Sequence, residues 1–303
     1  MKFKKILLPL DGSPLAERAL APAMCMAAGM SAEIVLLHVV VPLDIDLVLP
    51  EASLPHAAEE AGRYLAAVCA RFATDGVNMT SAVVVDFNTA TAVINYAEEN
   101  EVDLIVMSSH GRSELTRWRY GSVSARLLRQ ATCPVLVIPG QPSNEPDTFR
   151  RILLPLDGSD MAAQALESAV ALAHALSAEL ILLRAVALPY LAQELTTPER
   201  SIAQIEANVR AKAVAYLEQI KASLTTAHDI SVKTVAIIGS AADVIIDYAD
   251  EQDVDLIVMN SHGRSGILLW TYGSVTEKVL LGTDQAVMVV RRKSPAYLKE
   301  NWT

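Results

Sequence analysis

Two short motifs combine residue types that can bind an anionic ligand. Asp11 follows the first apolar segment within Pro-Leu-Asp-Gly-Ser, where its carboxylate can accept from a ribose hydroxyl or cap a helix. A later apolar segment, 103–107, leads into Ser-Ser-His-Gly-Arg-Ser at 108–113, and Gly-Ser-Val follows at 121–123. Small residues let backbone N–H groups approach a phosphate, and a helix N-terminus adds a favourable dipole. The pair of motifs predicts a phosphate-binding site, with a glycine turn and an ordinary helix start as the alternative.

Both motifs return in the second half of the chain. Pro-Leu-Asp-Gly-Ser recurs at 155–159, and residues 255–265 repeat 103–113 with one difference, Asn260 in place of Ser108. Such self-similarity indicates one domain of about 145 residues written twice. We therefore expect domains at 1–140 and 149–293, joined by a polar, proline-containing linker.

The segments between the motifs alternate between short apolar runs and helical patterns. This alternation predicts βαβ units, a parallel sheet and helices on both faces, and hence an α/β fold with two doubly wound domains. Long irregular segments at 41–56 and 187–200 read as surface loops that can act as lids. The expected elements are strands near 4–9, 33–40, 80–86, 103–107 and 134–138, helices near 14–29, 57–75, 89–99 and 121–131, and second-half strands near 150–155, 179–186, 231–237, 255–259 and 286–290.

In such a sheet, ligands bind outside the carboxyl ends of the strands, at the point where the strand order reverses. Asp11 and residues 108–113 follow the first and fourth expected strands. We therefore expect the two motifs to meet at one edge of each sheet.

Composition excludes several classes of protein. Hydrophobic residues make up 52% of the 303 residues, but an uncharged stretch such as 19–32 is interrupted by Pro22 and shorter than the roughly 20 residues of a spanning helix. A net charge of −10 argues against a nucleic-acid partner. The three cysteines, Cys25, Cys69 and Cys133, have neither metal-ligand spacing nor a disulfide pattern. A protein of the cytoplasm, with no membrane partner, is expected.

The motifs together resemble those of the universal stress protein family. The features that match are Pro-x-Asp-x-Ser after the first strand, Leu-Leu-His-Val at 36–39, and the block from Ser-His-Gly-Arg to Gly-Ser-Val. The resemblance covers nearly the whole chain, in two copies. It implies Rossmann-like five-stranded sheets of order 3-2-1-4-5 and an intrachain pseudo-dimer in which the strands at 134–138 and 286–290 pair.

In the nucleotide-binding branch of that family, a G-x2-G-x9-G-[ST] motif cradles the phosphates and ribose of ATP. The resemblance places adenine against the backbone of Val39 or Ala185 and beside Met107 or Met259. The implied site residues are Pro9, Leu10, Asp11, Val39, Met107, Ser108, Gly111, Arg112, Gly121, Ser122 and Val123 in the first copy, and Pro155, Leu156, Asp157, Ala185, Met259, Asn260, Gly263, Arg264, Gly273, Ser274 and Val275 in the second.

The first glycine of that motif is replaced in both copies. Ser108 stands there in the first and Asn260 in the second, and asparagine tolerates a positive φ better than serine. By this criterion the second copy keeps the better loop.

We expect a stress-response or regulatory protein that binds ATP, or ADP or AMP, with Mg²⁺ accompanying ATP and with slow hydrolysis at most. The resemblance also leaves room for a homodimer. One alternative is an interaction module of the same fold that binds no nucleotide, which the loss of the first motif glycine supports. Another is a hydrolase using His110 and His262 beside Ser109 and Ser261, although the sequence assigns no aspartate to orient either imidazole.

Overall fold

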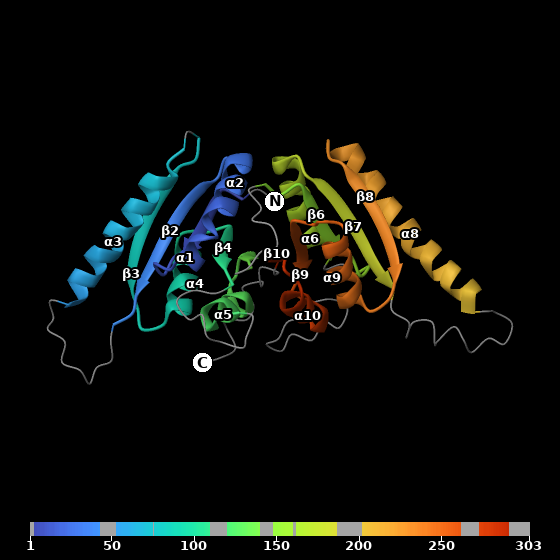
Figure 1. The fold of residues 1–303 in the computed structure, drawn as a ribbon. Coiled ribbons are helices and arrows are strands. Elements are labelled where there is room, and N and C mark those ends of the chain that lie inside the picture. Colours follow the sequence, from blue (N-terminus) through green and yellow to red (C-terminus); the bar gives the residue numbers. More distant parts are fainter. Residues whose placement is uncertain are drawn as a thin grey trace, which may run out of the picture. The chain divides into compact units, whose positions relative to one another are not determined.

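The computed structural model describes residues 3–42, 53–74, 76–109, 120–139, 148–159, 162–186, 202–261 and 273–290. The chain divides into two compact units between Pro142 and Ser143. Figure 1 shows the units, domain 1 and domain 2, as sheets accompanied by helices. In the described part of the chain, no helix is both long and apolar enough to span a membrane.

Domain 1 is built on a parallel sheet of order β3-β2-β1-β4-β5, in which β1 lies between β2 and β4. Because the chain leaves β1 toward β2 and later returns to its other side, the strand order reverses at β1. The strands are β1 (Lys5–Pro9), β2 (Glu33–Val40), β3 (Met79–Val85), β4 (Leu104–Ser108) and β5 (Val135–Ile138). The helices are α1 (Pro14–Glu17), α2 (Leu20–Met30), α3 (Ser53–Phe72), α4 (Thr89–Glu99) and α5 (Ser122–Gln130).

Domain 2 repeats this arrangement with the order β10-β9-β6-β7-β8, and the reversal falls at β6. The strands are β6 (Arg151–Pro155), β7 (Glu179–Val186), β8 (Val232–Ile238), β9 (Leu256–Asn260) and β10 (Ala286–Val290). The helices are α6 (Ala162–Leu176), α8 (Ile202–Ala227), α9 (Ala241–Glu251) and α10 (Ser274–Gly282). The prediction of two repeated α/β domains is confirmed.

The first helix of domain 1 differs from the prediction of one helix over 14–29. It breaks into α1 and α2, and the N–H groups of Arg18 and Ala19 donate to residues three positions back, at 3.3 and 3.2 Å. Pro22 lacks the N–H that would donate to the Arg18 carbonyl, so the regular ladder cannot run through this point. In domain 2, Ser168 takes the matching place and α6 is continuous.

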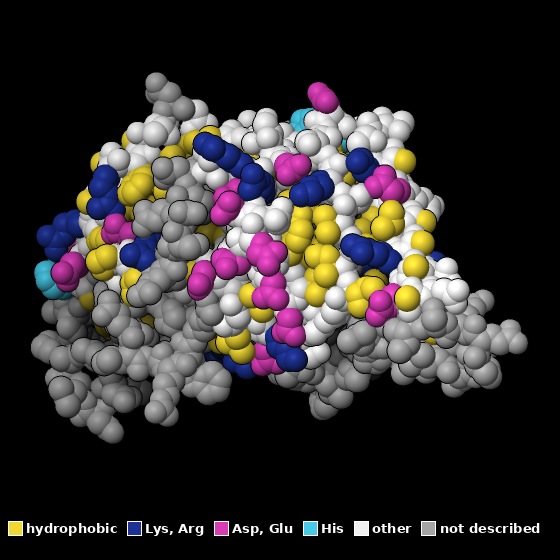
Figure 2. All heavy atoms as spheres, turned by 45° about the vertical axis from the view of Figure 1, so that its right-hand side comes forward, with side chains coloured by type: hydrophobic (Ala, Val, Ile, Leu, Met, Phe, Trp, Pro, Cys, Tyr) yellow, Lys and Arg dark blue, Asp and Glu magenta, His cyan; other side chains and the backbone are white. Residues whose placement is uncertain are grey.

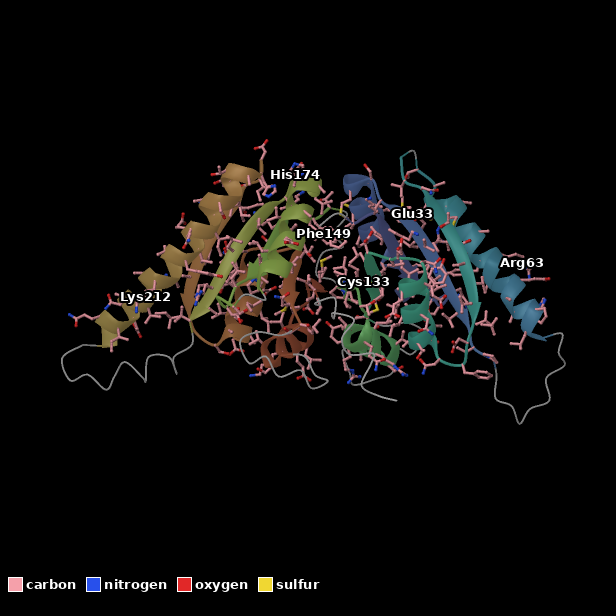
Figure 3. The ribbon with its side chains drawn as sticks, turned by 180° about the vertical axis from the view of Figure 1, so that it is seen from behind. Glu33, Arg63, Cys133, Phe149, His174 and Lys212 are labelled. Carbon is pink, nitrogen blue, oxygen red and sulfur yellow. The ribbon has the colours of Figure 1, made fainter. Side chains whose placement is uncertain are left out.

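The central strands are buried on both faces. Ile6, Leu7 and Leu8 of β1 are all fully buried although consecutive side chains point to opposite faces of a sheet. The aromatic residues that precede β1 and β6, Phe3 and Phe149, are also buried. Figure 3 labels Phe149. Figure 2 shows several acidic side chains close together near the middle of the view, with basic side chains above and beside them.

An aspartate clamps the amino ends of the two strands that flank the reversal. Asp103 Oδ2 accepts from the backbone N–H groups of Lys4 and Lys5, at 2.8 and 3.1 Å. In domain 2, Asp255 Oδ2 accepts from Arg150 and Arg151, at 2.7 and 2.8 Å. The N–H groups of Asp103 and Asp255 in turn donate to the carbonyls of Lys5 and Arg151, each at 3.0 Å. The clamp fixes β4 beside β1, and β9 beside β6, at the edge opposite the predicted site.

Replacing this aspartate by alanine removes two charge-assisted hydrogen bonds to backbone donors. We expect Asp103→Ala to lower the free energy of unfolding of domain 1 by about 2 kcal/mol, measured by urea denaturation. Glu33→Gln is the control, because this carboxylate lies 3.2 Å from the Lys5 ammonium in a surface pair of the same domain, and the loss of its charge should cost about 0.5 kcal/mol or less. Equal effects of the two variants would contradict the clamp.

Candidate functional site

The turn after β1 is anchored to the neighbouring strand in both domains. The N–H of Leu10 donates to the carbonyl of Leu37 at 2.8 Å, and Leu156 donates to Leu183 at the same distance. Leu10 and Leu156 are each only 3% exposed. The turn that carries the aspartate is therefore held over the carboxyl ends of β1 and β2, and of β6 and β7.

The aspartate itself organises the turn. Asp11 Oδ1 accepts from the N–H of Ser13 at 2.9 Å, and Asp157 Oδ1 accepts from both the N–H and the hydroxyl of Ser159, at 2.9 and 2.6 Å. The helix cap is Ser13, whose Oγ accepts from the N–H of Ala16 at 3.1 Å. Reading Asp11 as the N-cap is therefore wrong, because Asp11 makes an Asx turn two residues before the N-cap.

The glycine between these residues adopts a conformation that side chains disfavour. Gly12 has φ of 83° and Gly158 has φ of 81°. Both lie in the left-handed region, where a Cβ atom is costly. The Asp-Gly-Ser motif is thus explained by turn geometry alone, and ligand binding need not be invoked for the glycine.

The second motif returns the chain to the same edge of the sheet. The N–H of Gly121 donates to the carbonyl of Ser109 at 2.9 Å, and Gly273 donates to Ser261 at 2.8 Å. These glycines are the N-caps of α5 and α10, and neither helix has a side-chain cap. The first-turn N–H groups of both helices thus face the strand end without a capping oxygen from their N-cap residue.

A side-chain hydroxyl on each of these helices makes a second hydrogen bond to the end of the strand, and sequence reasoning missed it. Ser124 Oγ donates to the carbonyl of Ser108 at 3.2 Å, and Thr276 Oγ1 donates to that of Asn260 at 2.8 Å. Each lies three residues after the N-cap glycine, in the same place in both copies. The repeat of a small hydroxyl residue at this position was the available signal.

The other predicted site residues divide into three groups. Met107 and Met259 are buried in β4 and β9, Val39 and Ala185 are half-buried near the ends of β2 and β7, and Asn260 is half-buried at the end of β9. Ser108 is buried, and its hydroxyl has no hydrogen-bond partner among the described residues. Outside the described residues lie Gly111, Arg112, Gly263, Arg264, His110, His262, the segment 187–200 and most of 41–56.

A tyrosine from the long helix borders each turn, and sequence reasoning missed both. In domain 1, the hydroxyl of Tyr64 donates to Glu17 Oε1 at 3.0 Å, Arg71 pairs with Glu17, and the His38 ring meets Tyr64 edge-on with centroids 6.0 Å apart. Burial, and then the hydrogen bond to Glu17, raise the pKa of Tyr64, and the charge of Asp11 adds to this.

The corresponding residues of domain 2 are arranged differently. The Arg184 guanidinium lies over the Tyr216 ring, with 4.6 Å between its central carbon and the centroid. Burial raises the pKa of Tyr216; Arg184 lowers it and Asp157 raises it. Tyr216 stands 152 residues after Tyr64, the separation that also relates the motifs at 103 and 255. Aligning the two halves would therefore have revealed the tyrosine pair.

The described groups at this edge are of kinds that suit the binding of a ligand. They comprise backbone N–H donors, one carboxylate engaged in its turn, and apolar side chains beside them. Across the described ranges, no group of three or more His, Cys, Asp or Glu side chains is placed to hold a metal ion.

A side chain at Gly158 would disturb the turn. We expect Gly158→Ala to lower the free energy of unfolding of domain 2 by at least about 1 kcal/mol, because of the positive φ. The new Cβ would also lie 2.7 Å from Arg184 Nη1 and displace that guanidinium. The control is Gly62→Ala in helix α3, where nothing lies within 4 Å of the added Cβ, and which should stabilise by about 0.5–1 kcal/mol. Thermal and urea unfolding measure both, and a neutral Gly158→Ala would refute the turn geometry.

Comparison with known proteins agrees with this architecture. The family model described as "Universal stress protein family" matches residues 2–139 and again 148–291. Universal stress protein YxiE of Bacillus subtilis is 34% identical over 148 residues, which is 47% of this chain and 99% of that protein. A universal stress protein of Mycobacterium bovis is 29% identical over 238 residues, 77% of this chain and 78% of the relative.

The fold comparison extends over both domains. The crystal structure of a universal stress protein from Archaeoglobus fulgidus covers 96% of this chain and 100% of its own, with a TM-score of 0.72 and 21% identity. At that identity the likeness concerns the fold. Taken with the two family matches, which span most of the sequence, it leads to one assignment: the chain belongs to the universal stress protein family and carries two of its domains in tandem.

Proposed function

We propose that each domain binds an adenine nucleotide, ATP or its ADP or AMP relative, at the carboxyl edge of its sheet, and that the protein acts in stress response or regulation. The observation that carries this proposal is the pair of uncapped helices, α5 and α10, whose N-cap glycines are tied to the ends of β4 and β9. The same arrangement occurs in both copies, beside the turns that carry Asp11 and Asp157.

An uncapped N-terminus is a ready site for an anion. Its N–H groups lack an intrahelical partner, and the helix dipole favours negative charge there. In α1 and α4 of domain 1 an N-cap side chain satisfies such a donor: Ser13 accepts from the N–H of Ala16, and Asn88 accepts from the N–H of Thr91. The N-cap residues of α2 and α9 make no such bond either, so what distinguishes α5 and α10 is that their N-cap glycines are tied to the ends of β4 and β9. At α5 and α10 a ligand phosphate would take the place of the missing side-chain oxygen.

The rest of the edge suits a base and a ribose. Val39 and Ala185 lie two residues beyond the carbonyls that anchor the turns, so their backbone groups border the same edge. Met107 and Met259 offer apolar side chains on the neighbouring strands. Backbone polar groups for the base and apolar contact for its faces are what an adenine requires.

The proposal includes slow hydrolysis at most. Asp11 and Asp157 each accept hydrogen bonds that hold their own turns, which leaves them suited to position a ligand. Mg²⁺ would enter with ATP, held mainly by the phosphates. One universal stress protein of known structure is a complex with cAMP, a nucleotide bound by that protein. The cytoplasm is the proposed location.

The tandem of two domains fits an intrachain pseudo-dimer. Pairing of the strands at 134–138 and 286–290 stays a prediction, as does a homodimer.

Adding a side-chain cap tests the binding site while preserving the helix. Gly121 has φ of −65° and Gly273 has φ of −56°, which other residues adopt readily, and a Cβ on Gly121 would meet only Ser109 O at 3.7 Å. In Gly121→Asp/Gly273→Asp, the carboxylates would cap the first turns and repel a phosphate. We expect ATP affinity to fall at least tenfold, measured by isothermal titration calorimetry with Mg²⁺, while thermal stability is unchanged or raised.

The matched control is Gly121→Ala/Gly273→Ala, which leaves the first-turn N–H groups uncapped and should retain most of the affinity. Native mass spectrometry of the freshly purified chain adds a second readout, a co-purified nucleotide. If no nucleotide co-purifies and titration with ATP produces no heat, nucleotide binding is refuted and the interaction module is favoured.

Gly111→Val and Gly263→Val should abolish nucleotide binding, because the larger side chains would crowd the phosphate. Unchanged affinity in both variants would place the ligand elsewhere.

A further inference from the structure

The two domains differ in one charged residue beside the candidate site. Pro9 pairs with Leu37 in domain 1, and Pro155 pairs with Leu183 in domain 2. The residue that follows the paired leucine is His38 in domain 1 and Arg184 in domain 2. At the same register position, domain 1 therefore carries an imidazole and domain 2 a permanently charged guanidinium.

The guanidinium of Arg184 is held against the turn that carries Asp157. Its Nη1 and Nη2 atoms lie 2.7 and 3.0 Å from the position that a Cβ of Gly158 would occupy. On its other side is the ring of Tyr216. The planar group is thus stacked on an aromatic ring and packed on a glycine, which limits its freedom before any ligand arrives.

The hydrogen-bonding capacity of this guanidinium is unused within the described part of the chain. There, Arg184 donates no hydrogen bond and no carboxylate lies within 4 Å of it; its contacts are the Tyr216 ring and the Gly158 turn. A guanidinium has five N–H donors and no acceptor, and half-buried donors gain from an oxygen partner. In domain 1, by contrast, Arg71 pairs with Glu17.

We propose that Arg184 binds a phosphate oxygen of the nucleotide in domain 2. Domain 1 has no guanidinium at this register position, where it carries His38. The inference rests on the proposed function and adds a difference in ligand preference between the two sites. The stacked, pre-ordered fork suits a phosphate, which guanidinium groups bind bidentately. Domain 2 should therefore discriminate in favour of phosphorylated ligands more strongly than domain 1.

The test compares ATP, AMP and adenosine on the full chain by isothermal titration calorimetry. A Gly121→Asp background suppresses the domain 1 site, so the heat reports on domain 2. In this background, Arg184→Gln should weaken ATP binding about tenfold or more and change adenosine binding less than twofold. Arg184→Lys keeps the charge without the planar fork and should give an intermediate loss. His38→Gln, the matched change in domain 1, is measured in a Gly273→Asp background, which suppresses the domain 2 site instead, and should leave the ratio of ATP to adenosine affinity unaltered.

The outcomes separate the two proposals. If Arg184→Gln weakens ATP and adenosine equally, the residue only positions the turn, and its assignment as a phosphate ligand is overturned. The same holds if neither affinity changes. If the parent chain binds none of the three ligands, the proposed function fails and the role of Arg184 fails with it. Thermal unfolding of each variant confirms that the ratio is measured on folded protein.

Discussion

A backbone hydrogen bond from the N-cap glycine of a helix to the residue after a strand is the contact on which the candidate site depends. In each domain, Gly121 to Ser109 or Gly273 to Ser261, it brings the start of a helix back to the strand end beside the first turn. The glycine N–H binds the carbonyl at the strand end, but glycine has no side-chain oxygen that could cap the helix. The geometry that closes the loop therefore also leaves the helix N-terminus available to an anion.

Comparison of the two copies separates what the fold requires from what can vary. The strand clamp made by Asp103 and Asp255 and the left-handed glycine of the first turn are the same in both. The surroundings of the turn are not, because a Glu17–Tyr64–Arg71 network borders it in domain 1 and the Arg184–Tyr216 stack borders it in domain 2. The two domains thus share the backbone geometry of the strands and turns but differ in the charged side chains around the turn. Such a difference can give two copies of one fold different ligand preferences.

Much of the fold followed from the sequence, because buried parallel strands are continuous apolar runs and the repeat supplies each element twice. The prediction failed where local and tertiary effects compete. Pro22 divides the first helix, and Ser13 takes the capping role that Asp11 also suited. Tyr64 and Arg184 escaped attention because their contacts join a strand, a turn and a long helix, and spacing within one motif cannot reveal them.

We propose that the phosphates of the nucleotide contact the first-turn N–H groups of α5 and α10. Backbone amide NMR of the full, isotope-labelled chain during titration with ATP and Mg²⁺ tests this contact residue by residue. We expect the largest shifts at Ser122, Val123, Ser274 and Val275, with smaller ones at Asp11 and Asp157. Saturable shifts confined to other parts of the chain, or no shifts at any ATP concentration, would contradict this proposal.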